Sequence, residues 1–218
     1  MKTIFVPCAS RMDVLPAVKK ALTLFEDYEK IGIVSTPQHL CTLDKVSAFL
    51  SSKGKKPVVC GQILGCSQGK ALAEEKNVEA YLYIGSGMFH PLGLSVKTAK
   101  PVIAANPYSG LAEAVSPDRL SEWKKKQKAR LARAAGASVF GLLVSTKSGQ
   151  ENLALALKLK KKLEGSGKKA FLFSGTEIHP DRLVGYAVDA WVNTACPRIA
   201  EDFFDKPVLN PEELEVLL

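Results

Sequence analysis

Five cysteines have the side chains best suited to chemistry in this 218-residue sequence: Cys8, Cys41, Cys60, Cys66 and Cys196. Their number is odd, and their spacing is not that of a small disulfide-stapled scaffold, so we expect free thiols in a reducing compartment. A free cysteine in such a compartment fills the core, acts as a nucleophile or binds a metal. The residues around each cysteine therefore decide which role we expect.

Cys196 lies where a buried strand is expected to stop. An apolar run around Trp191 ends at Asn193, and the thiol then stands directly before Pro197 and Arg198. Because proline cannot donate a hydrogen bond to a sheet, we place Cys196 in the turn beyond the strand. Ligands of parallel α/β sheets bind outside the carboxyl ends of the strands, which makes this turn a candidate site.

Three more cysteines, Cys8, Cys60 and Cys66, fall at or beyond the expected ends of strands. Cys41 instead lies at the start of an expected helix, and we expect it to be buried filler. Thiolates that converge from separate units hold soft metals or iron–sulfur clusters. The sequence contains no C-x-x-C pair and no zinc motif, so spacing alone does not identify such a site.

A glycine-rich segment, IGSGMFHPLGL, follows another expected strand. Gly85 and Gly87 let backbone N–H groups approach an anion or a carboxylate, although a plain tight turn accounts for them as well. The segment lacks the GxGxxG spacing and the helix of a dinucleotide site, so we expect no nucleotide cofactor of that type. His90 could carry a proton, but a hydrogen-bonded structural histidine is the default interpretation.

Polar residues also stand beyond the strand that ends in LLVST. Lys147 and Gln150 could hold a carboxylate there, and Arg198 could do so with two parallel hydrogen bonds. No Ser-His-acid arrangement indicates a hydrolase, and no carboxylate pair is placed for glycosidic chemistry.

The composition is that of an ordinary globular protein, with 46% apolar and 24% charged residues. No apolar stretch approaches the roughly 20 residues that span a membrane, so we expect a cytoplasmic protein without a membrane partner. Much of the net charge of +8 lies in two expected helical segments, 123–133 and 158–169. Neither interleaves aromatic residues for base stacking, so we interpret both as solvated faces and expect no nucleic-acid partner.

Strand-like and helix-like segments alternate along the chain, which predicts a parallel α/β architecture. We expect strands at residues 2–8, 30–36, 56–60, 80–87, 101–107, 138–146, 169–175 and 187–194. We expect helices at residues 13–28, 43–52, 123–133, 150–163 and 181–186.

The two halves of the chain also resemble each other. IGIVSTPQHL in the first half resembles GLLVSTKSGQ in the second, and each leads into a helix and then a GKK that opens an apolar strand. A cysteine in a turn follows each copy, Cys66 in one and Cys196 in the other. A repeat of this length predicts two related α/β domains, which we assign to residues 1–112 and 113–218.

Several sequence motifs, in their residues and in their order along the chain, resemble those of the diphthamide-biosynthesis enzymes, the 2-(3-amino-3-carboxypropyl)histidine synthases. The resemblance covers nearly the whole chain and rests on GQILGC, IGSGMFHPLGL, VSTKSGQ and VNTACPRIAEDF followed by KPVLNPEE. It implies similar α/β domains arranged about a pseudo-threefold axis. This chain would supply two of the three, each a parallel sheet with flanking helices.

The resemblance also implies an activity. In this family one cysteine per domain binds a 4Fe-4S cluster, and the cluster cleaves S-adenosylmethionine to a 3-amino-3-carboxypropyl radical that is added to a histidine of elongation factor 2. By motif match Cys66 and Cys196 would be cluster ligands, and Cys60 is a candidate third ligand. We assign cofactor binding to seven further residues: Gln62, Gly85, Gly87, His90, Lys147, Gln150 and Arg198.

By this resemblance we expect the chain to depart from the family pattern, with a start at the second domain and without the first domain and its cysteine. The third thiolate would come from a second copy, from a separate first-domain protein, or from Cys60 or Cys8; Cys60 has the better case. Alternatively the chain is a non-catalytic iron–sulfur or partner-binding subunit, or a cluster enzyme for another substrate, so the sequence leaves open whether it is an enzyme. Faces left bare by a missing domain predict self-association or a partner.

Overall fold

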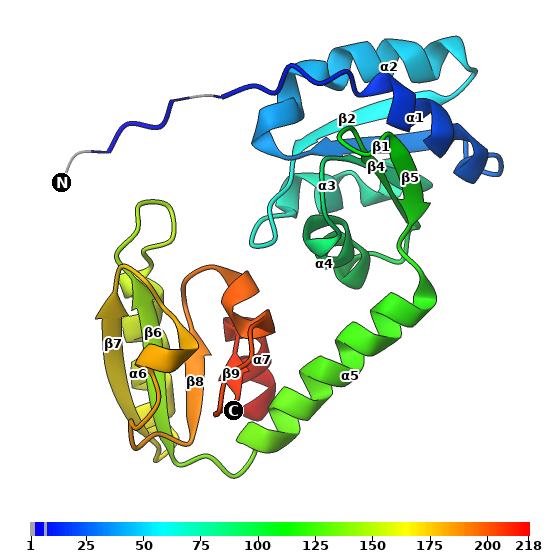
Figure 1. The fold of residues 1–218 in the computed structure, drawn as a ribbon. Helices are drawn as coiled ribbons and strands as arrows, with labels where there is room; N and C mark the ends of the chain where they lie inside the picture. Colours follow the sequence, from blue (N-terminus) through cyan, green and yellow to red (C-terminus); the bar gives the residue numbers. More distant parts are fainter. Residues whose placement is uncertain (1–2, 7) are drawn as a thin grey trace. The chain divides into compact units, whose positions relative to one another are not determined.

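The computed structural model describes residues 3–6 and 8–218 and divides into a first unit, Met1–Ser121, and a second unit, Glu122–Leu218. Each unit is an α/β fold with a sheet of its own, as the sequence predicts (Figure 1). Among the described residues, no helix combines the length and the apolar character needed to cross a membrane.

The sheet of the first unit has five strands in the order β2-β1-β3-β4-β5. Four of them are parallel, and the fifth pairs antiparallel with β4. Their bounds are β1 Lys30–Ser35, β2 Lys56–Gln62, β3 Ala80–Ile84, β4 Val102–Asn106 and β5 Leu111–Ala114. Because parallel strands require crossover connections, the carboxyl ends of β1 to β4 meet at one edge of this sheet.

Helices cover both faces of the first sheet (Figure 1). Alternate strand residues point to opposite faces, so Ile31 and Ile33 pack in one apolar cluster, while Tyr81 and Tyr83 pack in another. The helices α1 (Leu15–Ala21) and α2 (Leu43–Ser52) contribute to the first cluster, and α3 (Gly69–Ala73) and α4 (Phe89–Lys97) to the second. Short 3₁₀ helices complete the unit: η1 (Leu22–Leu24), η2 (Pro37–Thr42) and η3 (Glu75–Asn77).

The sheet of the second unit has four parallel strands in the order β7-β6-β8-β9. Their bounds are β6 Val139–Ser145, β7 Lys169–Gly175, β8 Ala190–Asn193 and β9 Val208–Leu209. The helices are α5 Pro117–Ala134, which crosses the boundary between the units, α6 Leu153–Gly165 and α7 Pro211–Leu217, with 3₁₀ helices η4 Pro180–Arg182 and η5 Pro197–Glu201.

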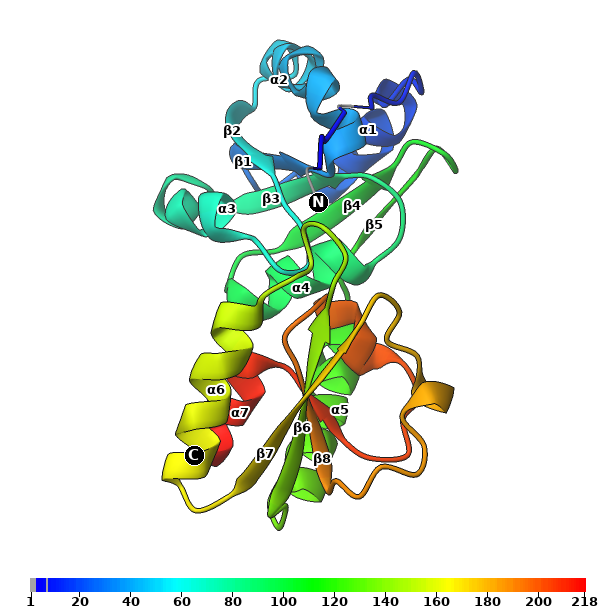
Figure 2. The ribbon, with the colours of Figure 1, turned by 90° about the vertical axis from the view of Figure 1, so that its left-hand side faces the viewer.

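The two faces of the second sheet are covered differently. One face carries Leu142 and Val144 and packs on α6, α7 and the end of α5. The helices α6 and α7 lie side by side, and Lys162 of α6 pairs with Glu215 of α7 (Figure 2). The other face is covered by Phe204 and by residues of η5, which pack on Trp191 of β8. The segment that carries Cys196 therefore lies against the core of its own unit.

The strand orders of the two sheets match, as the repeat predicts: β2-β1-β3-β4 corresponds to β7-β6-β8-β9. The cysteines that follow the two copies of the repeat, Cys66 and Cys196, nevertheless do not occupy equivalent positions in the two units. Cys66 follows β2, whose counterpart is β7, whereas Cys196 follows β8, whose counterpart is β3. The two thiols share only their location beyond the carboxyl ends of parallel strands.

Some predicted elements differ from the structure. Of the strand expected at residues 2–8, the described residues form no strand, and Ile4, Phe5 and Val6 are at least 73% exposed because no neighbouring strand pairs with them. A helix, α4, begins inside the glycine-rich segment, contrary to expectation; Pro91 is tolerated because it lies in the first turn. The division between the units lies inside α5, later than the expected boundary, since β5 still pairs with β4.

Candidate functional site

Cys66 stands on a tight turn between β2 and α3. Leu64 and Ser67 exchange two backbone hydrogen bonds across this turn, with N–O distances of 2.9 and 3.0 Å. The thiol between them is free and exposed. Ile63, one residue before the turn, is fully buried and anchors the turn to the second apolar cluster of the first unit. The thiol therefore projects from a fixed base.

Two further contacts fix the Cys66 turn. Nε2 of Gln68 donates hydrogen bonds to the carbonyl oxygens of Leu64 and Gly65, both at 2.8 Å, and Gln68 is only 3% exposed. Gly65 lies against the ring of Phe89, since a Cβ at this position would be 2.1 Å from a ring carbon. Phe89 begins α4, so the turn after β2 contacts the segment after β3.

The structure brings the predicted residues of the first unit to one edge of its sheet. Gln62 is in register with Ser35 of β1, and Ser35 is in register with Ile84, the residue before Gly85. Gly85 and Gly87 have positive φ angles of 158° and 71°. His90 lies in the first turn of α4, with its ring centroid 5.5 Å from that of Phe89. These residues share the edge with the Cys66 turn.

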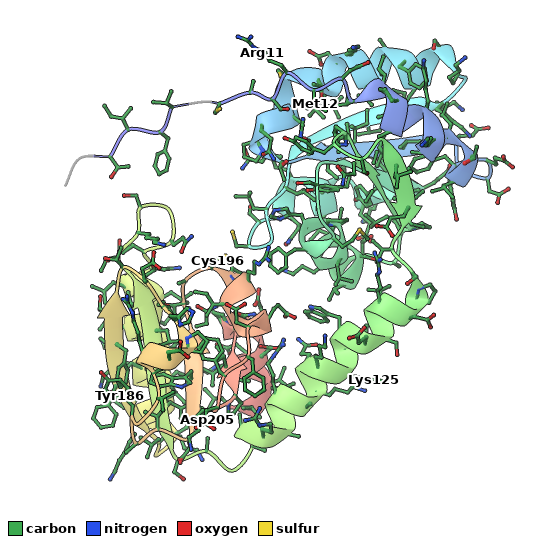
Figure 3. The ribbon with its side chains drawn as sticks, in the orientation of Figure 1. Arg11, Met12, Lys125, Tyr186, Cys196 and Asp205 are labelled. Carbon is green, nitrogen blue, oxygen red and sulfur yellow. The ribbon has the colours of Figure 1, made fainter. Side chains whose placement is uncertain are left out.

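Cys196 stands on the turn between β8 and η5 (Figure 3). Asn193, the last residue of β8, is 1% exposed, and its Nδ2 donates a hydrogen bond of 2.9 Å to the carbonyl oxygen of Cys196. The Oδ1 atom of Asn193 accepts a hydrogen bond of 3.0 Å from the backbone N–H of Ala195. Pro197 opens η5, where its fixed φ suits the first helical position. Cys196 is free and half-buried.

A pocket of about 200 Å³ lies beside Cys196 within the second unit. Three of the predicted cofactor residues line it: Lys147, Gln150 and Arg198. They come from two loops, one after β6 and one after β8, and these strands are neighbours in the sheet. The structure thus gathers a thiol, an ammonium, a carboxamide and a guanidinium around one opening, and two carboxylates also line it. The opening therefore offers donors for a carboxylate and acceptors for an amino group.

The pocket also contains residues that the sequence did not single out, above all Glu177 in the loop after β7. Nζ of Lys147 lies 2.7 Å from Oε1 of Glu177, and this contact lowers the pKa of the glutamate. Thr146 and Thr176 share a hydrogen bond of 3.0 Å between the same two loops. The position of Glu177 directly beyond a strand end was the only signal in the sequence that could have identified it.

The remaining cysteines have contrasting environments. Cys60 is 4% exposed in the second apolar cluster of the first unit, and burial, with a smaller effect of Glu74, raises the pKa of its thiol to about 11. These properties are those of a core thiol and argue against a ligand role. Cys41 was expected to be buried but is exposed on η2, because His39 and Leu43 take the inward positions. Cys8 is also exposed.

Across the described residues, 3–6 and 8–218, no group of three or more His, Cys, Asp or Glu residues is placed to hold a metal ion. The chemistry of two individual donors nevertheless fits an iron–sulfur cluster. Cys66 and Cys196 are free thiols that solvent reaches, each beyond the end of a parallel strand. Soft thiolates of this kind are the usual ligands of such clusters.

Comparison with known proteins identifies relatives along the whole chain. Residues 1–218 match the family model of the diphthamide synthesis proteins. The chain is 36% identical to the 2-(3-amino-3-carboxypropyl)histidine synthase of Pyrococcus horikoshii, over 99% of this chain and 65% of the relative. It is 32% identical to subunit 1 of the Gallus gallus synthase, over 86% of this chain and 48% of the relative.

A solved structure is similar as well. The crystal structure of Dph2 from Pyrococcus horikoshii with a 4Fe-4S cluster matches with a TM-score of 0.86 and 36% identity, over 96% of this chain and 63% of that chain. The chain thus spans less than two thirds of the length of these relatives. The match over all 218 residues shows that the chain belongs to the diphthamide synthesis protein family.

Proposed function

We propose that this chain takes part in 3-amino-3-carboxypropyl transfer of the diphthamide type, with a histidine of elongation factor 2 as the acceptor. The observation that carries the proposal is the pocket in which Lys147, Gln150 and Arg198 surround Cys196. Two relatives that this chain matches over 99% and 86% of its length are synthases of this kind. A cytoplasmic setting belongs to the proposal, because accessible free thiols persist in a reducing compartment.

Cys66 and Cys196 each contribute one thiolate to an iron–sulfur cluster in this proposal. When bound, the cluster supplies the electron that cleaves S-adenosylmethionine. The chain's own residues bind and orient the substrate: Arg198 and Gln150 hold its amino acid end, and Lys147 is kept in place by Glu177. A guanidinium suits a carboxylate because it donates two parallel hydrogen bonds.

The third thiolate is proposed to come from outside the core of the first unit. Cys60 is buried with a raised pKa, whereas Cys8 is an exposed thiol. The remaining sources are another protein chain, either a second copy or a protein with the family's first domain. Three thiolates leave one iron of a 4Fe-4S cluster open for S-adenosylmethionine, so a third source is needed for catalysis.

A non-catalytic iron–sulfur or partner-binding subunit is the second candidate. The burial of Cys60 leaves the third ligand to Cys8 or to another chain, and a chain that needs a partner to complete its site can serve as a subunit without catalysing the reaction itself. The two candidates differ in one measurable property. Only the enzyme consumes S-adenosylmethionine when it is supplied with a reductant and elongation factor 2.

Anaerobic reconstitution with iron and sulfide tests the proposal. We expect about four irons per chain and broad absorption near 400 nm in the wild type. The signal should be lost in Cys66→Ala and Cys196→Ala and kept in Cys60→Ala. Loss in Cys8→Ala would identify Cys8 as the third ligand, and about two irons per chain would indicate a cluster shared between copies. A wild type that binds no iron, alone or with a first-domain protein, would refute the proposal.

Binding of S-adenosylmethionine gives a second test. Arg198→Ala and Gln150→Ala should weaken binding by roughly tenfold or more, as expected when a charge-assisted hydrogen bond is lost. Tyr186→Ala is a suitable control, because this exposed residue is not among those that line the pocket. Equal affinity in the wild type and in all of these variants would show that the pocket does not bind S-adenosylmethionine.

A further inference from the structure

Each proposed cluster cysteine stands on a turn that is held by a buried carboxamide. In the Cys66 turn, Nε2 of Gln68 donates to two backbone carbonyl oxygens, each at 2.8 Å. In the Cys196 turn, Nδ2 of Asn193 donates to the carbonyl oxygen of Cys196 itself at 2.9 Å. Gln68 is 3% exposed and Asn193 is 1% exposed.

Burial makes these hydrogen bonds important. A buried amide donor without a partner carries a free-energy cost of about 1 to 3 kcal/mol, so each side chain favours the conformation in which its turn is folded. The thiol of Cys66 is exposed, and packing therefore does little to fix it. The carboxamide of Gln68 replaces that packing, because it ties the exposed turn to the interior beneath it.

The Cys196 turn is tied to two helices as well. Nδ2 of Asn193 also donates to Oδ1 of Asn210 at 2.9 Å, and the backbone N–H of Asn210 donates to Oε2 of Glu213 at 2.8 Å. Oε1 of Glu213 accepts a hydrogen bond of 2.8 Å from Nη2 of Arg130. A continuous chain of hydrogen bonds therefore connects α5 and the start of α7 with the backbone of Cys196.

We propose that Gln68 and Asn193 are positioning residues that hold the Cys66 and Cys196 turns in their ligand-binding conformations before metal arrives. This inference rests on the proposed function, because it takes the two thiols as ligands. A turn that is already ordered avoids the loss of conformational entropy on binding. Partners that orient ligands commonly change metal affinity by about 10- to 100-fold.

Hydrogen exchange of the metal-free full chain tests the positions of the turns independently of iron. Gln68→Met and Asn193→Leu keep the side-chain volume and remove the hydrogen bonds. Gln68→Met should speed exchange of residues 63–68 roughly tenfold and leave residues 194–199 unchanged, and Asn193→Leu should do the reverse. Each variant thus serves as the control for the other. Unchanged exchange in both turns, or an equal rise in both, would overturn the inference.

A matched control separates local loosening from lower stability of the second unit. Asn152→Ala removes a helix cap, since Oδ1 of Asn152 accepts from the N–H of Leu155 at 3.2 Å, and this cap shares no atom with the hydrogen bonds of the Asn193 side chain. We expect exchange at residues 194–199 to stay within roughly twofold of the wild type in this variant. If exchange at these residues rose as much in Asn152→Ala as in Asn193→Leu, the effect of Asn193 would be one of general stability and not of the turn.

Reconstitution with iron and sulfide supplies a spectroscopic readout. In Gln68→Met and Asn193→Leu, iron should leave the protein roughly tenfold faster, and the electron paramagnetic resonance spectrum of the reduced cluster should change. Asn152→Ala should keep the spectrum of the wild type. If the wild type takes up no iron while exchange responds as expected, the proposed function fails and the role of the two amides in ordering the turns stands. Unchanged iron release and spectra would overturn the inference.

Discussion

The thiol of Cys60 donates a weak hydrogen bond to the carbonyl oxygen of Val58, with 3.5 Å between sulfur and oxygen, inside an apolar cluster of the first unit. This contact gives the thiol a partner within its own strand. Only five residues separate Cys60 from the exposed Cys66, yet the two thiols have opposite environments. Neighbouring cysteines of this chain are therefore expected to differ sharply in reactivity.

We expect Cys60 to resist alkylation at pH 8, while Cys8, Cys41 and Cys66 react. Its pKa is raised to about 11, mainly by burial, so the reactive thiolate is scarce at this pH. Peptide-resolved mass spectrometry after iodoacetamide treatment measures all of the thiols in one sample. Modification of Cys60 at the rate of Cys41 would show that the first unit opens readily around β2.

The raised pKa of the Cys60 thiol also predicts a loss of stability at high pH. The unfolded chain releases this proton near the ordinary thiol pKa of 9.0, whereas the folded chain keeps it until about 11. The first unit should therefore lose stability as pH rises through that window. Urea unfolding of the wild type and of Cys60→Ala at pH 8 and pH 10 measures the effect. An equal change with pH in both proteins would assign the loss to other groups.

The ion pair of Lys147 and Glu177 predicts a local titration. The side-chain hydrogen bond and the charge of Lys147 lower the pKa of Glu177, so Lys147→Met should return this pKa toward its ordinary value. The pair contributes above the ordinary glutamate pKa and is lost as pH falls through the lowered pKa. Nuclear magnetic resonance of the Glu177 carboxyl carbon measures the titration. The same pKa in wild type and Lys147→Met would mean that the pair does not persist in solution.

Most of the strands and the repeat could be predicted from the sequence. Buried parallel strands are short apolar runs, and the two copies of the repeat have similar sequences. It missed α4, since Gly93 and Pro91 resemble a loop, and β9, since two residues give no periodic signal. Residues 3–6 show the opposite error, because an apolar run becomes a strand only where a sheet pairs with it.

For the site, motif resemblance pointed to Cys66 and Cys196. The places of Lys147, Gln150 and Arg198 beyond strand ends pointed to these three residues, and the structure places them around one pocket with Cys196. The hydrogen bonds that hold the two cysteine turns could not be predicted, because they depend on which buried polar atoms come within bonding distance in the folded unit. Gln68 and Asn193 look like ordinary polar residues in the sequence, and their burial comes from packing of the finished unit. Cys60 fell at an expected strand end and became a candidate ligand. The strand instead continues to Gln62, which places Cys60 inside it.

Gly65 predicts a steric effect on the Cys66 turn. In Gly65→Ala the new Cβ would lie 2.1 Å from the ring of Phe89, so the turn or the ring must move. We expect a loss of about 1 to 3 kcal/mol from the free energy of unfolding and a displaced thiol. Gly69→Ala is the matched control, because a Cβ at Gly69 has no neighbour within 4 Å. Thermal unfolding compares the two, and equal Tm values would show that Phe89 yields without cost.

We predict that Arg130 and Glu213 contribute non-additively to the free energy of unfolding of the second unit. The side chain of Glu213 is 3% exposed, and Nη2 of Arg130 lies 2.8 Å from its Oε1. Arg130→Met would leave the carboxylate buried without its cation, which typically costs about 3 to 5 kcal/mol. Glu213→Gln should cost less, because a neutral amide needs no cation and can still accept from the N–H of Asn210.

The double variant Arg130→Met/Glu213→Gln should therefore be more stable than the sum of the two single changes predicts. A double-mutant cycle by urea unfolding measures this coupling, and we expect about 1 to 3 kcal/mol. Lys126→Met with Glu122→Gln is the matched control, since that ion pair on α5 is well exposed and should couple by less than about 1 kcal/mol. Additive effects at Arg130 and Glu213 would mean that water, and not the arginine, satisfies the buried carboxylate.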